Sequence, residues 1–178
     1  NFAINLLKAI AEHKERINIE IVAPTNVFEA YPFLSTEFET KITKVQSNRV
    51  RRVVSENLVF RNHRSSSVVH HMGGTAARTP SDTKAVTTIY DLQFLEYPEN
   101  FSVPKKLFLG KAVPAAIKGS NVICVTSKFV AESVLTRFDI PESSIRIIKP
   151  SITAPESVSG RSGIKTPFVM FPAVTWPH

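Results

Sequence analysis

The sequence predicts a doubly wound α/β domain, in which a mostly parallel sheet carries helices on both faces. Two observations lead to this prediction. Segments whose apolar residues recur at helical spacing alternate along the chain with short β-branched segments. The β-branched segments are continuous apolar runs, which is typical of parallel strands buried on both sides.

The N-terminal part contains the first four predicted elements. Residues 1–14 carry apolar side chains at helical spacing, and residues 17–22 form a β-branched run that stops at Pro24. Residues 42–45 are a short strand candidate. Residues 48–60 place valines and leucines among arginines, which suits a helix.

The same alternation continues toward the C-terminus. Strands are expected at residues 67–71, 85–90, 121–125 and 145–148, with a helix at 103–118. Pro114 should kink or shorten that helix. A second helix is expected to start after an N-cap at Thr126 or Ser127 and to bury one apolar face, made of Phe129, Val130, Val134 and Phe138. Residues 151–167, rich in Ser, Pro and Gly, are interpreted as a linker before a last strand at 168–171.

Composition excludes several classes of protein. A chain of 178 residues, 43% hydrophobic and 21% charged, is an ordinary globular domain, not a disordered or disulfide-scaffolded chain. Cys124 is the single cysteine and lies in the apolar run NVICV, so a buried, reduced thiol is expected. No apolar stretch approaches the roughly 18 to 20 residues of a membrane span, and no signal peptide is recognised. A cytoplasmic protein is therefore expected.

Most of the net charge of +7 comes from one stretch. Residues 41–64 hold seven basic residues against one acidic residue, Glu56. Such a basic stretch could meet nucleic acid, an anionic membrane or a phosphate-bearing substrate, or could be a solvated helix face and loop. Nucleic acid is not expected, because no zinc-finger spacing, RNP-type motif or Gly-x-x-Gly clamp accompanies the charge.

Polar residues follow three of the predicted strands. Ligands of an open α/β sheet bind beyond the carboxyl ends of its strands. The residues expected there are His70, His71, Gly73 and Gly74 after the first of these strands, Tyr90 and Asp91 after the second, and Thr126, Ser127 and Lys128 after the third. The third group opens a helix, whose free N–H groups and dipole favour a phosphate.

Simpler interpretations stay open for each group. Adjacent histidines on a strand point to opposite faces, and no further Cys/His cluster accompanies them, so no metal is expected. Asp91 could cap a helix or turn, and Thr126 and Ser127 could be no more than an N-cap. The chain contains neither a Gly-x-Ser-x-Gly elbow nor a Gly-x-x-x-x-Gly-Lys loop, so hydrolases and P-loop enzymes find little support.

Four segments, in order and spacing, resemble the family-four retaining glycosyltransferases of the GT-B type. They are VVHHMGG, AVTTIYDLQFLEYPENF, NVICVTSKFVAESVLTRFDIPESSIRIIKPSI and PFVMFPAVTWPH. The resemblance is to the N-terminal, acceptor-side domain, a Rossmann-like half of the GT-B fold. It covers residues 1–15 weakly and residues 67–178 well. It implies an acceptor domain at 1–155 that lacks its first strand, followed at 156–178 by a linker and the start of a truncated donor-binding domain.

The resemblance implies transfer of a sugar from a nucleotide-sugar to a glycan or lipid-linked acceptor, with retention and without metal or other cofactor. The donor would be held mainly by the C-terminal domain, so this chain alone is expected to be inactive. Tyr90 and Asp91 would shape the floor of the site, with His70, His71 and the Gly73-Gly74 loop on the acceptor side. Tyr90 stands where many members have a histidine, and a phenol, whose pKa is about 10, is a poor base at neutral pH.

The family also gives the basic stretch at 41–64 a more specific interpretation. Such domains often rest on the inner membrane face, so this stretch is expected to make a peripheral contact with anionic lipid. Two alternatives remain open. One is another nucleotide-sugar enzyme of the doubly wound class, such as an epimerase, and the other is a non-catalytic α/β binding module.

Overall fold

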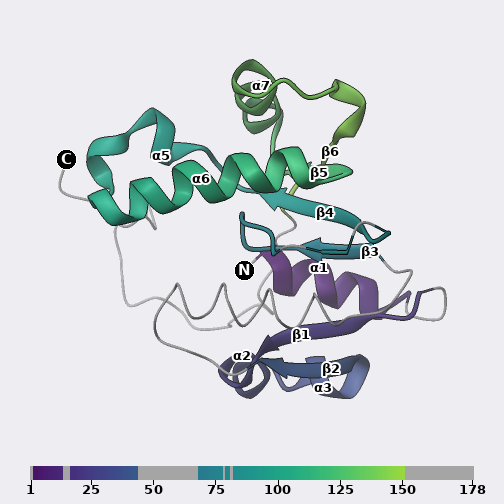
Figure 1. Cartoon of the computed structure of the whole chain (residues 1–178). Helices are drawn as coiled ribbons and strands as arrows, with labels where there is room; N and C mark the ends of the chain where they lie inside the picture. Colours follow the sequence, from purple (N-terminus) through teal and green to yellow (C-terminus); the bar gives the residue numbers. More distant parts are fainter. Residues whose placement is uncertain (1, 14–16, 44–67, 78, 81, 151–178) are drawn as a thin grey trace, which may run out of the picture.

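The computed structural model describes residues 2–13, 17–43, 68–77, 79–80 and 82–150 (Figure 1). Within these residues helices and strands alternate, and every pair of neighbouring strands is parallel. The α/β class is therefore confirmed. The predictions for residues 48–60, 151–167 and 168–171 lie outside the described residues, as does most of the basic stretch at 41–64.

The N-terminal elements differ in detail from the predicted ones. They are α1 (Phe2–Ala11), β1 (Glu20–Pro24), α2 (Thr25–Ala30), α3 (Phe33–Glu37) and β2 (Glu39–Thr43). Both strands are displaced by two or three residues from the predicted ranges, and neither α2 nor α3 was predicted. Pro24 and Pro32 stand at the N-caps of these two short helices. β1 ends at Pro24, as predicted, and the same residue is the N-cap of α2.

The remaining elements follow the predicted order closely. They are β3 (Val68–His71), β4 (Lys84–Ile89), α5 (Gln93–Glu96), η2 (Pro98–Asn100), α6 (Val103–Gly119), β5 (Val122–Val125), α7 (Lys128–Arg137), η3 (Glu142–Ser144) and β6 (Ile145–Ile147). Each of these strands starts and ends within one residue of its predicted range. The short helices α5, η2 and η3 were not predicted, since three or four residues are too few to show a helical period.

The strands form two hydrogen-bonded groups. One is the two-stranded sheet β1-β2, and the other is the four-stranded sheet β3-β4-β5-β6. In Figure 1, α1 lies between β1 of the two-stranded sheet and β3 of the four-stranded sheet. The six strands therefore build a parallel framework whose two sheets are not joined by a ladder among the described residues.

Helices cover both faces of the four-stranded sheet, which confirms the doubly wound arrangement. Thr87 points toward the α6 side, where its hydroxyl lies 2.7 Å from that of Ser120. Thr88 points to the opposite side, where its hydroxyl lies 2.8 Å from Nε2 of His70. These two faces alternate along β4 because successive side chains of a strand point in opposite directions.

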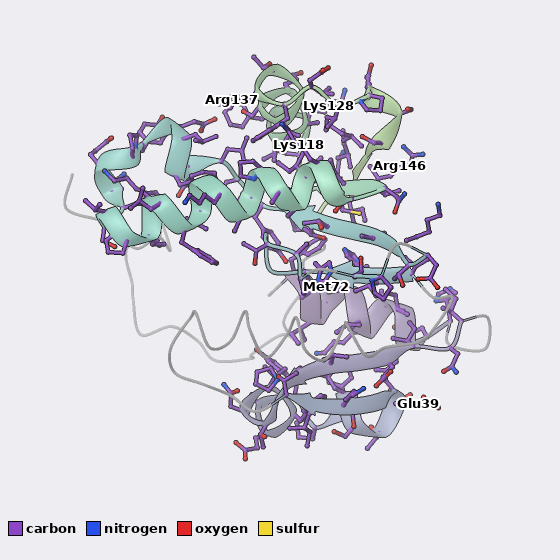
Figure 2. The ribbon with its side chains drawn as sticks, viewed as in Figure 1. Glu39, Met72, Lys118, Lys128, Arg137 and Arg146 are labelled. Atoms are coloured by element: carbon purple, nitrogen blue, oxygen red, sulfur yellow. The ribbon has the colours of Figure 1, made fainter. Side chains whose placement is uncertain are left out.

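Two hydrophobic cores hold the molecule together. The first joins the four-stranded sheet to α6 and α7 through Ile89, Leu92, Phe94, Val113, Ile117, Ile123, Val125, Val130, Ala131, Val134 and Phe138. The second joins α1 to the two-stranded sheet through Ile4, Leu7, Ile21, Phe28, Leu34 and Phe38. Met72 packs against the second core from the loop after β3, and Figure 2 shows it between the two sheets.

Pro114, Cys124 and Phe129 are three residues whose surroundings the sequence predicts specifically. Pro114 does not shorten α6, which runs unbroken through 17 residues. Burial of the neighbouring Val113 and Ile117 offsets the hydrogen bond that a proline removes. Cys124 is buried and free, as predicted. Phe129 was predicted on the buried face of α7 but is 68% exposed, because Val130 and Val134 define that face instead.

Candidate functional site

Two of the three predicted groups of polar residues, and the glycine pair of the other group, lie at one edge of the sheet. β3, β4 and β5 are parallel neighbours, so the segments that follow them leave the sheet on the same side. Figure 1 shows α5 and the start of α6 at this edge, beyond the end of β4. Tyr90 and Asp91 follow β4 at this edge, and Thr126 to Lys128 follow β5, as predicted. His70 and His71 were expected beyond the end of their strand but lie within β3, in register with residues inside β4.

A cavity of about 210 Å³ opens at this edge between α5 and α7. Its lining residues are Asp91, Leu92, Gln93, Glu96, Tyr97, Phe129, Val130 and Ser133. Leu92 and Val130 are buried and are shared with the first core, so they give the cavity an apolar base. The rings of Phe129 and Tyr97 are largely exposed, at 68% and 54%. Exposed aromatic rings beside a cavity are available to a ligand that has an apolar face.

Two carboxylates line the cavity, and they differ in their hydrogen-bond and ion-pair partners. Glu96 Oε1 accepts a hydrogen bond of 3.2 Å from the Ser133 hydroxyl and lies 3.4 Å from an Nη atom of Arg137. The negative charge of Glu96 is therefore paired with the positive charge of Arg137, which Figure 2 shows on α7. Asp91 is exposed, and one of its oxygens accepts a bond of 3.1 Å from the backbone N–H of Gln93.

The bond to Gln93 confirms that Asp91 caps a turn, one of the interpretations left open by the sequence. A carboxylate can accept several hydrogen bonds, so this one leaves acceptor capacity directed to the cavity. Asp91 can therefore both fix the turn after β4 and receive hydroxyl or N–H donors of a ligand.

Tyr90 lies behind the cavity and is not among its lining residues. Its hydroxyl donates a hydrogen bond of 2.8 Å to the carbonyl oxygen of Met72. Its ring meets that of Phe2 edge to face, with centroids 5.6 Å apart. Burial raises the pKa of Tyr90 above its usual range, so the phenolate that could act as a base is still scarcer at neutral pH. Through these contacts Tyr90 connects the end of β4 to the loop after β3 and to α1.

The two histidines are held within β3 and do not line the cavity. They lie on opposite faces of the strand, as predicted: His70 meets Thr88, and His71 is in register with Thr87. Burial lowers the pKa of His70. Burial, and then the nearby His70, lowers the pKa of His71 to about 4. Both rings are therefore expected to be neutral at pH 7.

The glycine pair forms the turn that leaves β3. Gly74 has a φ of +77°, a left-handed conformation that other residues adopt at a cost. This conformation explains a glycine at position 74, whereas Gly73 has no such requirement. The turn directs the chain past the Met72 carbonyl that Tyr90 contacts.

The segment after β5 is largely engaged in local structure. The Thr126 hydroxyl donates to the carbonyl oxygen of Tyr90 at 3.4 Å. The Ser127 hydroxyl accepts from the Val130 N–H at 3.3 Å, which confirms Ser127 as the N-cap of α7. Lys128, the first residue of α7, is exposed and is labelled in Figure 2. A phosphate at this helix start stays a prediction.

Glu96, Tyr97 and Ser133 line the cavity without having been singled out from the sequence, and Phe129 was predicted only as part of the buried face of α7. The signal that could have found Phe129 is its position directly before the apolar stripe of α7. The other three depend on how α5 approaches α7, which no local pattern encodes.

The described residues also bear on metal binding and on membrane spanning. Among these residues, no group of three or more His, Cys, Asp or Glu side chains is arranged to hold a metal ion. No helix within the same residues combines the length and the apolar character needed to cross a membrane.

Comparison with protein-family models, with curated proteins and with solved structures finds no significant match to this chain.

Proposed function

We propose that this chain is the acceptor-side part of a retaining glycosyltransferase, which moves a sugar from a nucleotide-sugar to a glycan or lipid-linked acceptor. One observation carries the proposal: the cavity beyond the end of β4 combines exposed aromatic rings with an exposed carboxylate. The cavity lies at the strand ends where α/β domains bind their ligands. The family resemblance supplies the reaction type, and the cavity supplies a place for the acceptor.

The lining chemistry suits one sugar ring. A pyranose presents C–H groups on its faces and hydroxyls around its rim. Phe129 and Tyr97 offer rings for the faces, and the carboxylate of Asp91 accepts hydrogen bonds from hydroxyls. The side-chain amide of Gln93 adds both donors and an acceptor. A cavity of about 210 Å³ is smaller than sites for drug-sized ligands, so a single ring is the expected occupant.

The residues behind the cavity hold the cavity-lining residues in place and do not contact the ligand themselves. Tyr90 and Thr126 tie the ends of β4 and β5 together, because the Thr126 hydroxyl bonds to the Tyr90 carbonyl. This fixes the start of the Asp91 turn. The donor nucleotide-sugar is expected near the start of α7, at Lys128, with most of its contacts made by a donor-binding domain. Cytoplasmic location and the lipid contact of residues 41–64 belong to the same proposal.

Sugar binding at the cavity is the experiment that tests the proposal. Saturation-transfer NMR with a panel of mono- and disaccharides should show transfer to at least one sugar. Phe129→Ala and Asp91→Asn should each weaken that binding by about tenfold, the effect expected from losing roughly 1.4 kcal/mol of stacking or hydrogen bonding.

Ile42→Ala is the matched control, since Ile42 is also exposed but lies on β2. Its binding should equal that of the unmodified protein. If no sugar showed saturation transfer, the proposed acceptor site at this cavity would be contradicted. An equal loss of sugar affinity in all three variants would also contradict it.

A non-catalytic binding module is a second candidate, and the state of Tyr90 favours it. The Tyr90 hydroxyl is already committed to Met72 and its pKa is raised, so it is not a proton acceptor at neutral pH. Sugar binding without any transfer from a nucleotide-sugar, measured by mass spectrometry with the donor-binding domain joined to the chain, would favour the module.

A further inference from the structure

We propose that the cavity between α5 and α7 takes a sugar that carries a free, positively charged amino group, which is the class of unacetylated amino sugars. This inference rests on the proposed function, because it names the kind of sugar that the acceptor cavity binds. It comes from the charge of the lining and from the two exposed aromatic rings of the cavity.

The lining of the cavity is acidic, although the chain has a net charge of +7. The described residues that line it include two carboxylates, Asp91 and Glu96, and no Lys, Arg or His. A ligand with a negative group, such as a sugar acid, would meet repulsion here without a basic side chain to offset it. The lining therefore favours a neutral or a positively charged ligand.

The two carboxylates do not offer the same charge to a ligand. Glu96 Oε1 lies 3.4 Å from Nη2 of Arg137, so its charge is balanced within the protein. Asp91 is exposed, and the bond that it accepts comes from the neutral backbone N–H of Gln93. The charge of Asp91 is therefore the one that a cationic ligand would meet in the cavity.

The exposed rings of Phe129 and Tyr97 provide a second partner for a cation. The face of an aromatic ring attracts an ammonium group that lies within about 6 Å of the ring centroid. The same chain already contains such a contact, since Nζ of Lys105 lies 4.5 Å from the centroid of the Phe101 ring. Exposed rings and a carboxylate in one cavity are thus the two kinds of group that bind an ammonium ion.

The rest of the lining suits a sugar ring as the carrier of the amine. Leu92 and Val130 form a buried apolar base that one face of a ring can cover. Gln93 is exposed and offers its side-chain amide to ring hydroxyls. An alkylammonium ion without hydroxyls would make no use of this amide. The cavity therefore favours an amino sugar over a simple amine.

The basic residues of α7 lie at its two ends. Lys128 and Arg137 are its first and last residues, both are labelled in Figure 2, and neither lines the cavity. Arg137 is paired with Glu96, and Lys128 is exposed, so its charge is screened by water and salt. The charge of the lining itself is therefore set by the carboxylates.

NMR titration with three methyl glycosides tests the inference. The glycosides of glucosamine, N-acetylglucosamine and glucose share one ring and differ in a charged amine, a neutral amide or a hydroxyl, and the galactose series repeats the comparison. Slightly below pH 7 the amine is protonated. The amino sugar of at least one series should then bind about tenfold more tightly than its two neutral counterparts.

Asp91→Asn removes the charge but keeps an oxygen that can cap the turn. It should reduce the preference for the amino sugar from about tenfold to about twofold, because the aromatic rings remain. Glu132→Gln is the matched control, since it removes the same charge from an exposed position of α7 that does not line the cavity. The control should keep the preference, and circular dichroism of both variants verifies that they fold.

The possible results separate this inference from the proposed function. Equal affinity for the amino sugars and their neutral counterparts would overturn the inference and leave a neutral-sugar acceptor site in place. If none of the sugars bound, the proposed function would fail as well. Cyclohexylammonium, which has a ring and a charge but no hydroxyls, should bind more weakly than the amino sugar. Equal binding of cyclohexylammonium, or an equal loss of preference in Glu132→Gln, would also contradict the inference.

Discussion

Tyr90 shows how the surroundings of a single residue decide what it can do. The sequence places Tyr90 at the end of a strand, where a catalytic group is expected. In the structure its hydroxyl donates a hydrogen bond to the Met72 carbonyl and its ring packs against Phe2. Its contacts thus connect three elements, and the neighbouring Asp91 is the residue that reaches the cavity.

His71 gives the molecule a pH-dependent stability. Its folded pKa of about 4 lies below the value near 6.5 of an unfolded chain, so between these values the unfolded chain binds the extra proton. The stability is full above pH 6.5 and decreases as the pH falls toward 4. The expected loss is up to about 1.4 kcal/mol per pH unit for this one proton.

Urea unfolding between pH 7 and pH 5 measures this loss. His71→Gln should flatten the dependence, and His13→Gln, which changes an exposed histidine, should leave it as it is. An identical slope in the protein and in His71→Gln would show that another group is responsible.

The start of α7 depends on one side chain. Ser127 accepts a bond from the Val130 N–H, so Ser127→Ala should lower the free energy of unfolding by about 1 kcal/mol. Ser102 is the N-cap of α6 but makes no side-chain capping bond, so Ser102→Ala is the control and should have a smaller effect. Thermal unfolding of both variants makes the comparison. Equal losses would mean that the two hydroxyls are equivalent, contrary to the geometry.

The two prolines of α6 should respond in opposite ways to replacement. Pro114 lies inside the helix and removes a hydrogen bond, so Pro114→Ala should raise the free energy of unfolding by about 1–2 kcal/mol. Pro104 lies in the first turn, where proline is tolerated and restricts the unfolded chain. Pro104→Ala should therefore leave stability unchanged or lower it by up to about 1 kcal/mol. Chemical denaturation resolves the sign, and a loss of stability in Pro114→Ala would disprove the reasoning.

At the scale of the molecule, the part of the chain that the structure describes has two hydrophobic cores. Among the described residues, no backbone hydrogen bond joins residues 2–43 to residues 68–150. The Phe2–Tyr90 contact and the packing of Met72 connect the two parts. Regions with separate cores can open separately, each with its own free energy.

Truncation in each core tests this independence. Leu34→Ala, in the second core, should cost about 2–5 kcal/mol and lower the hydrogen-exchange protection of β1 and β2. Protection of β4 and β5 should stay the same. Ile123→Ala, in the first core, should give the converse pattern. A uniform loss of protection in either variant would mean that the chain unfolds as one unit.

Local sequence patterns were enough to predict the strands of the four-stranded sheet. β3 to β6 are short apolar runs bounded by polar or turn residues, and such runs are legible without knowledge of the rest of the chain. The N-cap of α7 was predictable for the same reason, since a cap involves only residues three positions apart. The shared edge of the polar residues that follow β4 and β5 was predictable from the parallel order of the strands.

The tertiary structure alone decided the site. Phe129 and Val130 are neighbours in the chain, yet one is exposed and the other buried, because packing selects which side of α7 meets the sheet. The cavity arises where α5 and α7 approach each other, and its partners Glu96 and Ser133 are far apart in sequence. Contacts between distant segments depend on the packing of whole elements, and a local pattern of residue types does not encode that packing.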